Sequence, residues 1–262
     1  MRYALDVQYR GKNYDGSQIQ FEAGKEVGNT IQGELEKVLC TLIESKAQIN
    51  NRPIKTIFSG RTDKGVNALG QVVHFDTDKE IVASKFIYQM NEILPDDISV
   101  SNLRIVPDSF HAQKSAKARY YRYELINRRY KQAFDGDILR VKYELDIERM
   151  QTALNFLLGE HDFSSFKSSG TLNPSKVCFI SRADVEKQGD RVFIHIEGNR
   201  FLYNMVRTIV GTLLEVGRGK LSIEGFRNVI EQQDRCKAGT SVPGHALFLV
   251  DVEYPDTLFV KT

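Results

Sequence analysis

Apolar residues follow two alternating rhythms through the first hundred residues of the chain. Strand-like apolar stretches occur at residues 2–9, 54–58, 70–75 and 98–106. Between them, apolar residues recur every three or four positions from about residue 30 to 42 and from 83 to 94, which predicts two helices. Asn29 or Thr30 is the expected cap of the first helix, and Pro95 ends the second. Residues 24–29 are predicted as a loop, so the first half has the order βαββαβ.

The second half repeats this rhythm. Strands are predicted at 118–126, 177–186, 192–197 and 248–254, and helices at 147–158, at 203–216 and after a capping Ser222. We therefore expect an α/β protein of the α+β type, with two ferredoxin- or RRM-like units at residues 1–107 and 108–262. Each unit would have a mixed, mainly antiparallel sheet with helices on its outer face, and the open faces would line a central RNA-binding cleft.

Composition narrows the function classes only slightly. Hydrophobic residues make up 41% of the 262 residues and charged residues 27%, which favours a packed core. The formal charge of +2 is compatible with nucleic-acid binding but does not indicate it. Cys40, Cys178 and Cys236 are widely spaced, which predicts reduced thiols and no metal site. An acidic Asp6 and the absence of a long apolar stretch favour a soluble, cytoplasmic protein without a membrane span.

The segment from Ser59 to Ala68, SGRTDKGVNA, carries the most distinctive chemistry of the chain. It lies between two predicted strands and holds Arg61 and Asp63, which share one side of an extended segment because side chains alternate. Its glycines allow sharp bends or a close approach of backbone to a ligand. These residues alone leave two interpretations open: a catalytic carboxylate beside a guanidinium, or a hairpin turn with a surface ion pair.

The same segment resembles the GRTDxGVHA signature of the TruA-type tRNA pseudouridine synthases. Further blocks resemble the same family in order along nearly the whole chain: Tyr14–Gln20, FHA at 110–112, ARYYRY at 118–123, GEHDFSSF at 159–166, FLYNMVRTIVG at 201–211 and VPGHALFL at 242–249. The chain departs from the family pattern where Asn67 replaces a histidine and Gln113 an arginine. It also has no tryptophan, so the family's Gly-Trp-Gln element is missing.

The resemblance implies isomerisation of uridine to pseudouridine at positions 38, 39 and 40 of the tRNA anticodon stem-loop. This reaction breaks the bond from ribose C1′ to uracil N1 and rebuilds it to C5, without a metal or other cofactor. By resemblance, Asp63 is the catalytic carboxylate, and attack on the sugar, attack on the base and removal of a ribose proton all stay open. Arg61 would assist flipping of the target base, whose unstacking costs a few kcal/mol.

The remaining site residues follow from the same resemblance and from local patterns. Tyr121 would pack on the target base, sharing a strand face with Arg119 and Tyr123. Arg207 lies on an otherwise apolar predicted helix, where a cation needs a partner, and we expect it to pair with Asp63. Lys64 and Arg119 are candidate substrate contacts. The resemblance also implies a homodimer that grips the anticodon stem-loop and the elbow of tRNA.

Two alternatives belong to other function classes. A non-catalytic RNA-binding or chaperone protein on the same scaffold would have no use for a carboxylate close to phosphates. Another enzyme that cleaves glycosidic bonds would be expected to carry paired carboxylates, whereas the signature segment offers only Asp63.

Overall fold

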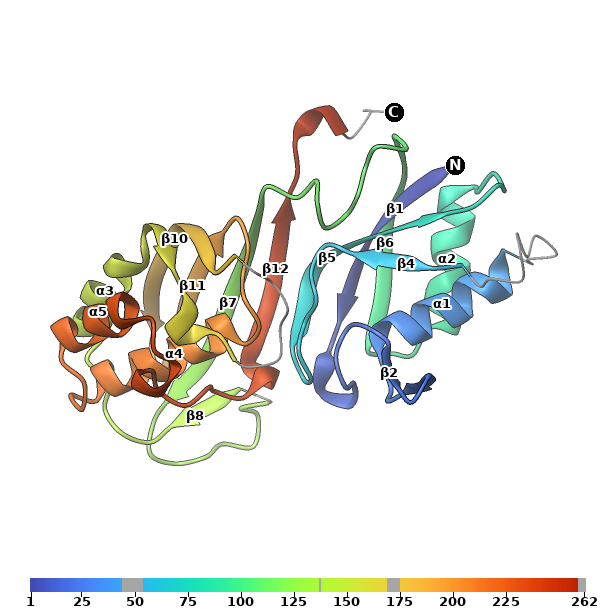
Figure 1. Cartoon of the computed structure of the whole chain (residues 1–262). Helices are drawn as coiled ribbons and strands as arrows, with labels where there is room; N and C mark the ends of the chain where they lie inside the picture. The colour runs from blue at the N-terminus through green and yellow to red at the C-terminus, as the bar shows by residue number, and fades with distance from the viewer. Residues whose placement is uncertain (44–53, 137, 169–174, 259–262) are drawn as a thin grey trace. The chain divides into compact units, whose positions relative to one another are not determined.

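The computed structural model describes residues 1–43, 54–136, 138–168 and 175–258 (Figure 1). It divides into two compact units. Unit 1 comprises Met1–Lys117 together with Leu249–Thr262, and unit 2 comprises Ala118–Phe248. This division differs from the expected ranges 1–107 and 108–262, because the last strand of the chain returns to unit 1. Pairing between segments so far apart in the sequence leaves no local signal.

Unit 1 contains an antiparallel sheet and two helices. Its elements are β1 (Arg2–Tyr9), β2 (Gln20–Glu22), β3 (Lys25–Val27), α1 (Ile31–Leu42), β4 (Thr56–Phe58), β5 (Asn67–Asp76), α2 (Ala83–Ile93), β6 (Ile98–Val106) and most of β12 (Leu247–Glu253). The strand order is β6-β1-β5-β12, with β4 also paired to β5. Both helices lie on one face of this sheet (Figure 1).

The helix boundaries of unit 1 follow from capping and proline chemistry. The Thr30 hydroxyl accepts a hydrogen bond from the Gly33 N–H at 3.2 Å, so Thr30 caps α1. Leu94 already has extended backbone (ψ 149°) before Pro95, which ends α2 as expected. The predicted loop at 24–29 is wrong in part, because β2 and β3 form a hairpin there. The side chains of β2 are all exposed, so no apolar alternation revealed it.

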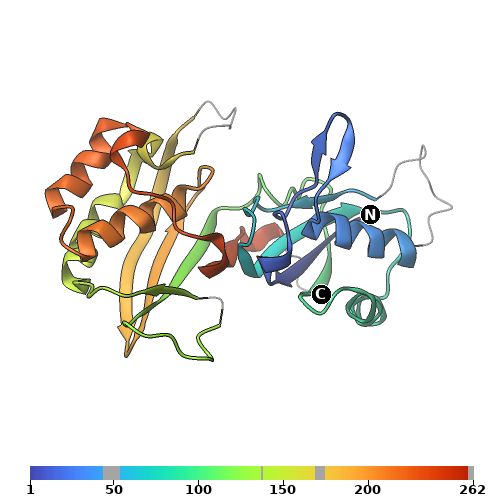
Figure 2. The same ribbon diagram turned by 90° about the horizontal axis from the view of Figure 1, so that it is seen from below.

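Unit 2 is built on the same plan. Its elements are β7 (Ala118–Asn127), β8 (Leu139–Val141), α3 (Ile147–Leu154), β9 (Gly159–Asp162), β10 (Val177–Gln188), β11 (Arg191–Gly198), α4 (Met205–Gly217) and α5 (Ile223–Gln232). The strand order is β7-β11-β10-β9, and β8 pairs with β7 in parallel. The three helices cover one face of the sheet (Figures 1 and 2).

Two differences from the expected elements of unit 2 have local causes, and one expected cap is confirmed. The helix expected at 147–158 ends at Leu154, where a 3-10 turn at Asn155–Leu157 leads into the short strand β9. The helix expected from 203 begins only at Met205, because Asn204 adopts a left-handed conformation (φ 61°). Ser222 caps α5 by accepting from the Gly225 N–H at 2.9 Å, as predicted.

The structure confirms the α+β class, with mainly antiparallel sheets and helices on one face of each. Within the described ranges, no helix combines the length and apolar character needed to cross a membrane.

Candidate active site

The signature segment connects β4 to β5, and buried hydrogen bonds hold its backbone. The Thr62 N–H donates to the Ser17 hydroxyl at 2.8 Å, and the Ser17 N–H donates to the Thr62 carbonyl at 3.0 Å. The Thr62 hydroxyl bonds the Tyr9 phenol at 2.8 Å, and the Gln71 amide donates to the Gly60 carbonyl at 3.0 Å. Because Ser17, Thr62 and Gln71 are all buried, these hydrogen bonds hold the loop on its core side.

This anchoring separates the side chains of the loop by direction. Thr62 points into the core, whereas Arg61 is exposed and Asp63 half-buried on either side of it. The expected alternation is therefore present: the guanidinium and the carboxylate both leave the buried side of the segment. The hydrogen bonds at Thr62 fix the backbone that carries Asp63, and a defined position is what a reacting group requires.

Two further loop residues have structural partners. The Lys64 ammonium forms a 2.7 Å ion pair with Asp15. This contact and a hydrogen bond from the Asn29 N–H both lower the pKa of the Asp15 carboxyl. Lys64 is largely exposed, so a phosphate contact would compete with Asp15 in solvent. The Asn67 side-chain oxygen accepts the Gly11 N–H at 2.9 Å, which gives a structural role to the position where the family has histidine.

Backbone packing beneath the loop is unusually close. A Cβ atom on Gly11 would lie 2.0 Å from the Val66 carbonyl oxygen, so only glycine fits there. Gly65 has φ +78°, a conformation that glycine adopts without strain. The signature segment thus depends on Gly11, far away in the sequence, as well as on its own glycines.

In unit 2, β7 separates its interleaved arginine and tyrosine side chains onto two faces. Tyr121 and Tyr123 pair in register with Ile196 and Ile194 and are buried. The Tyr123 phenol donates to the Pro243 carbonyl at 2.9 Å, as expected for a core tyrosine. Tyr121 is 8% exposed and meets the Phe201 ring edge-on at 5.0 Å. The structure therefore places Tyr121 in an aromatic pair close to the segment that leads into α4.

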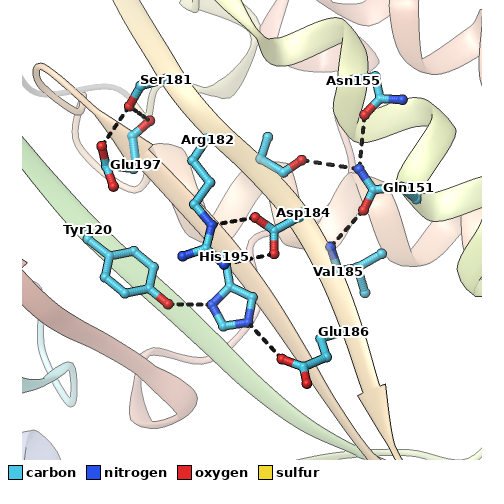
Figure 3. A network of polar contacts seen from close by, with 11 residues as sticks. Tyr120, Gln151, Asn155, Ser181, Arg182, Asp184, Val185, Glu186, His195 and Glu197 are labelled. Atoms are coloured by element: carbon cyan, nitrogen blue, oxygen red, sulfur yellow. Dashed lines mark hydrogen bonds and ion pairs between the residues drawn. The ribbon is translucent and has the colours of Figure 1, made fainter.

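The opposite face of this sheet carries a polar network (Figure 3). The Tyr120 phenol and the His195 Nδ1 lie 2.5 Å apart, Glu186 is 3.8 Å from the other ring nitrogen, and Arg182 pairs with Asp184. Burial lowers the pKa of His195, so its ring is neutral at pH 7. This face therefore carries both signs of charge, with Arg182 and Asp184 as its ion pair in Figure 3.

Arg207 lies in the first turn of α4, half-buried, with its guanidinium held by uncharged acceptors. Its Nε donates to the Val242 carbonyl at 2.8 Å, and one Nη donates to the Asn204 side-chain oxygen at 2.6 Å. The Asn204 amide donates in turn to the Ser168 hydroxyl at 3.1 Å. These two hydrogen bonds fix the orientation of the guanidinium at the start of α4.

Asn204, which accepts a hydrogen bond from Arg207, was not among the predicted site residues. The available signal was an asparagine directly before an apolar helix, because asparagine is one of the few residues other than glycine that tolerates a left-handed conformation.

Arg119, a predicted substrate contact, donates to the Asn199 carbonyl at 2.8 Å. Asp63, Arg61 and Lys64 belong to unit 1, and Tyr121, Arg119 and Arg207 to unit 2, so the Asp63–Arg207 ion pair stays a prediction.

The histidines of the matching blocks make backbone contacts. His111 Nδ1 accepts from the Gln113 N–H at 3.2 Å, and His161 Nε2 lies 2.9 Å from the Leu158 carbonyl. Burial raises the pKa of the Cys178 thiol to about 11, which keeps it protonated. Among the described side chains, no group of three or more His, Cys, Asp or Glu is arranged to hold a metal ion.

Comparison with known proteins relates these features to one family. The family model described as tRNA pseudouridine synthase matches residues 153–255. The chain is 44% identical to tRNA pseudouridine synthase A of Bacteroides thetaiotaomicron, over 98% of this chain and 92% of that protein. It is 43% identical to the protein of the same name from Parabacteroides distasonis, over 98% of both chains, and 41% identical to that of Bacillus subtilis, over 97% and 99%. The chain therefore belongs to the tRNA pseudouridine synthase family.

Proposed function

We propose that this protein converts uridine to pseudouridine at positions 38, 39 and 40 of the tRNA anticodon stem-loop, with Asp63 as the reacting carboxylate. One observation carries the assignment. Asp63 follows Thr62, whose backbone N–H and carbonyl are both hydrogen-bonded to buried Ser17. Arg61 and Asp63 flank this buried residue and are both more exposed than it is. The carboxylate acts close to the sugar while the uracil detaches from C1′, turns and reattaches through C5.

The other residues act on the RNA around this carboxylate. Arg61 is exposed and takes the place vacated by the flipped uridine, where a guanidinium stacks and donates hydrogen bonds. Tyr121 packs on the target base, and Arg207 pairs with Asp63 and keeps it ionised. Lys64 and Arg119 contact the substrate backbone. The hydrogen bonds from Arg207 to Val242 and Asn204 support this role, because they hold the guanidinium in one orientation.

A pair of substitutions tests the carboxylate. Asp63→Asn keeps the side-chain volume and removes the reactive oxygen, so we expect no pseudouridine in an unmodified tRNA transcript after incubation, as mapped by carbodiimide modification and primer extension. Asp78→Asn is the matched control, since Asp78 is an exposed carboxylate beyond the end of β5. Isomerisation by Asp63→Asn at the rate of the control would refute the assignment. Binding of tRNA without turnover by the wild-type protein would favour a non-catalytic RNA-binding protein instead.

We propose further that the protein works in the cytoplasm as a homodimer that holds both the stem-loop and the elbow of one tRNA. The support is the family and the size of the chain, since a 29.9 kDa protomer offers limited surface for both ends of tRNA. Sedimentation equilibrium at micromolar concentration tests the dimer. A single species of monomer mass with full activity would contradict it.

A further inference from the structure

The segment between β7 and β8 displays the most exposed large hydrophobic side chain among the described residues. Phe134 is 97% exposed, and Tyr130 in the same segment is 69% exposed. We call residues 128–136 the aromatic arm; it is the green segment that leads into β8 in Figure 1. Full burial of one such side chain would contribute about 1.5–3 kcal/mol, and the fold of unit 2 forgoes this at both positions.

The arm has a defined backbone. The Arg128 Nε donates to the Tyr130 carbonyl at 3.0 Å, and one Arg140 Nη donates to the Arg129 carbonyl at 2.7 Å. The Gln132 N–H donates to the Asp135 carboxylate at 2.9 Å. Two guanidinium groups and one carboxylate therefore fix successive peptide units, so the exposed rings project from a braced segment.

The charges of the arm are sorted by position. Arg128, the first residue of the arm, forms ion pairs with Asp135 and with Asp190 of the turn between β10 and β11. Both carboxylates are therefore paired with a cation. Arg129 and Lys131 are exposed on either side of Tyr130. The exposed part of the arm thus presents cations and aromatic rings. Asp135, the acid among the arm's described residues, is neutralised by Arg128.

This combination fits a nucleic acid better than a protein. Phosphates attract lysine and arginine through release of counterions, and unpaired bases stack on aromatic rings with about 1–3 kcal/mol per base. The Arg128 guanidinium lies 6.0 Å from the Tyr130 ring centroid and supports that ring from within the arm. Lysine is depleted in protein interfaces, whereas exposed Lys131 follows Tyr130 directly in the arm.

We propose that the aromatic arm is an RNA-binding element that stacks unpaired tRNA bases on Phe134 and Tyr130 and contacts phosphates through Arg129 and Lys131. The arm lies outside the signature segment and α4 in the sequence, and it adds substrate affinity without taking part in the chemistry. The identification of the RNA as tRNA rests on the proposed function. The binding chemistry itself rests on the exposed rings and cations.

Affinity and salt dependence separate the two kinds of contact. Phe134→Ala should weaken binding of an unmodified tRNA transcript at least about fivefold with an unchanged salt slope, because stacking releases no counterions. Lys131→Ala should weaken binding and lower the slope of log affinity against log salt by about 0.7–0.9. Tyr88→Ala is the matched control, since Tyr88 is a 65% exposed aromatic residue on α2. Affinity of Phe134→Ala equal to that of Tyr88→Ala would overturn the proposal.

A direct reporter is available because the chain has no tryptophan. Phe134→Trp introduces a single indole whose emission should be quenched when tRNA is added, whereas Tyr88→Trp should keep its emission. Loss of binding through a folding defect cannot imitate quenching, so this measurement stands independently of the alanine variant. Unchanged emission of Phe134→Trp at saturating tRNA would show that no base stacks there.

Turnover distinguishes failure of this proposal from failure of the proposed function. Phe134→Ala should raise KM at least about fivefold and leave kcat unchanged, because the arm does not contact the reacting atoms. If the wild type forms pseudouridine and Phe134→Ala has the same KM, only the arm proposal fails. If the wild type forms none, the function fails whatever the arm binds. A sedimenting mass that falls in Phe134→Ala without a change in tRNA affinity would assign the arm to a protein interface and overturn the proposal.

Discussion

Asn204 links a strained backbone to the orientation of Arg207, and three substitutions separate these contributions. Asn204→Gly keeps the left-handed conformation without strain and removes the side chain. Asn204→Ala removes the side chain and imposes the strain of a Cβ at φ 61°. Asn204→Asp keeps the oxygen that accepts from Arg207 at 2.6 Å and loses the amide that donates to Ser168.

The expected magnitudes follow from these contacts. A hydrogen bond to a charged group contributes about 1.5–3 kcal/mol, and half-exposed Arg207 places this one at the lower end, so Asn204→Gly should cost about 1.5 kcal/mol of unfolding free energy. The left-handed conformation costs alanine about 1 kcal/mol more than glycine, which brings Asn204→Ala to about 2.5 kcal/mol. That loss corresponds to a fall in Tm of about 5–10 °C. Asn204→Asp should be the most stable of the three.

Urea unfolding and turnover on unmodified tRNA transcript measure the two consequences side by side. Both Asn204→Gly and Asn204→Ala should lower kcat by a similar factor, because each removes one of the two acceptors that orient the guanidinium, although they differ in stability. Asn204→Asp should retain most of the activity. Equal stability of the glycine and alanine variants would refute the strain argument, and wild-type kcat in both would show that Asn204 does not position Arg207.

Three further substitutions test other parts of the structure. Gly11→Ala should cost about 3 kcal/mol, because its Cβ meets backbone at 2.0 Å, whereas Gly60→Ala in open space should change stability by less than about 0.5 kcal/mol; urea midpoints decide, and equal values would contradict the close packing. Burial lowers the pKa of His74 to about 4 from an unfolded value of 6.5, so stability is full above pH 6.5 and falls as pH drops to 4, by about 3 kcal/mol. His74→Gln should flatten that part of the pH–stability curve, and a wild-type slope in this variant would refute the assignment. Arg207→Lys should preserve charge and lower kcat/KM at least about tenfold because a lysine lacks the planar fork; wild-type kcat/KM would show that the guanidinium geometry is not needed.

The parts of the fold that the sequence predicts are those governed by local rules. The apolar stripe of α1, its cap at Thr30 and its position before the signature segment all follow from spacing and capping chemistry. The β2–β3 hairpin was missed because β2 buries no side chain, so no hydrophobic alternation marks it. The return of the last strand to unit 1 was missed because strand pairing between distant segments is set by tertiary packing.

The candidate site shows the same division. The alternation of Arg61 and Asp63 about a buried Thr62 follows from the period of extended backbone. The hydrogen bonds that hold this segment come from Tyr9 and Ser17, and nothing in the sequence between residues 59 and 68 indicates those partners. Asn67 departs from the family pattern, and the sequence gives no reason for this. The structure shows that its side-chain oxygen accepts a hydrogen bond from the Gly11 N–H.

The discontinuity of unit 1 has a consequence for synthesis of the chain on the ribosome. β12 lies beside β5, the Lys117 N–H donates to the Glu253 carbonyl at 2.8 Å, and the Tyr254 phenol donates to the Ala112 carbonyl at 2.6 Å. The sheet that carries the signature segment therefore lacks β12 until residues 118–248 have been translated. At about 5–20 residues per second, this is a delay of roughly 7–26 s. Unit 2 is continuous and can fold during that interval. A nascent chain thus completes the unit that bears Asp63 last, and a stop codon shortly before residue 249 would leave β5 without its neighbour β12.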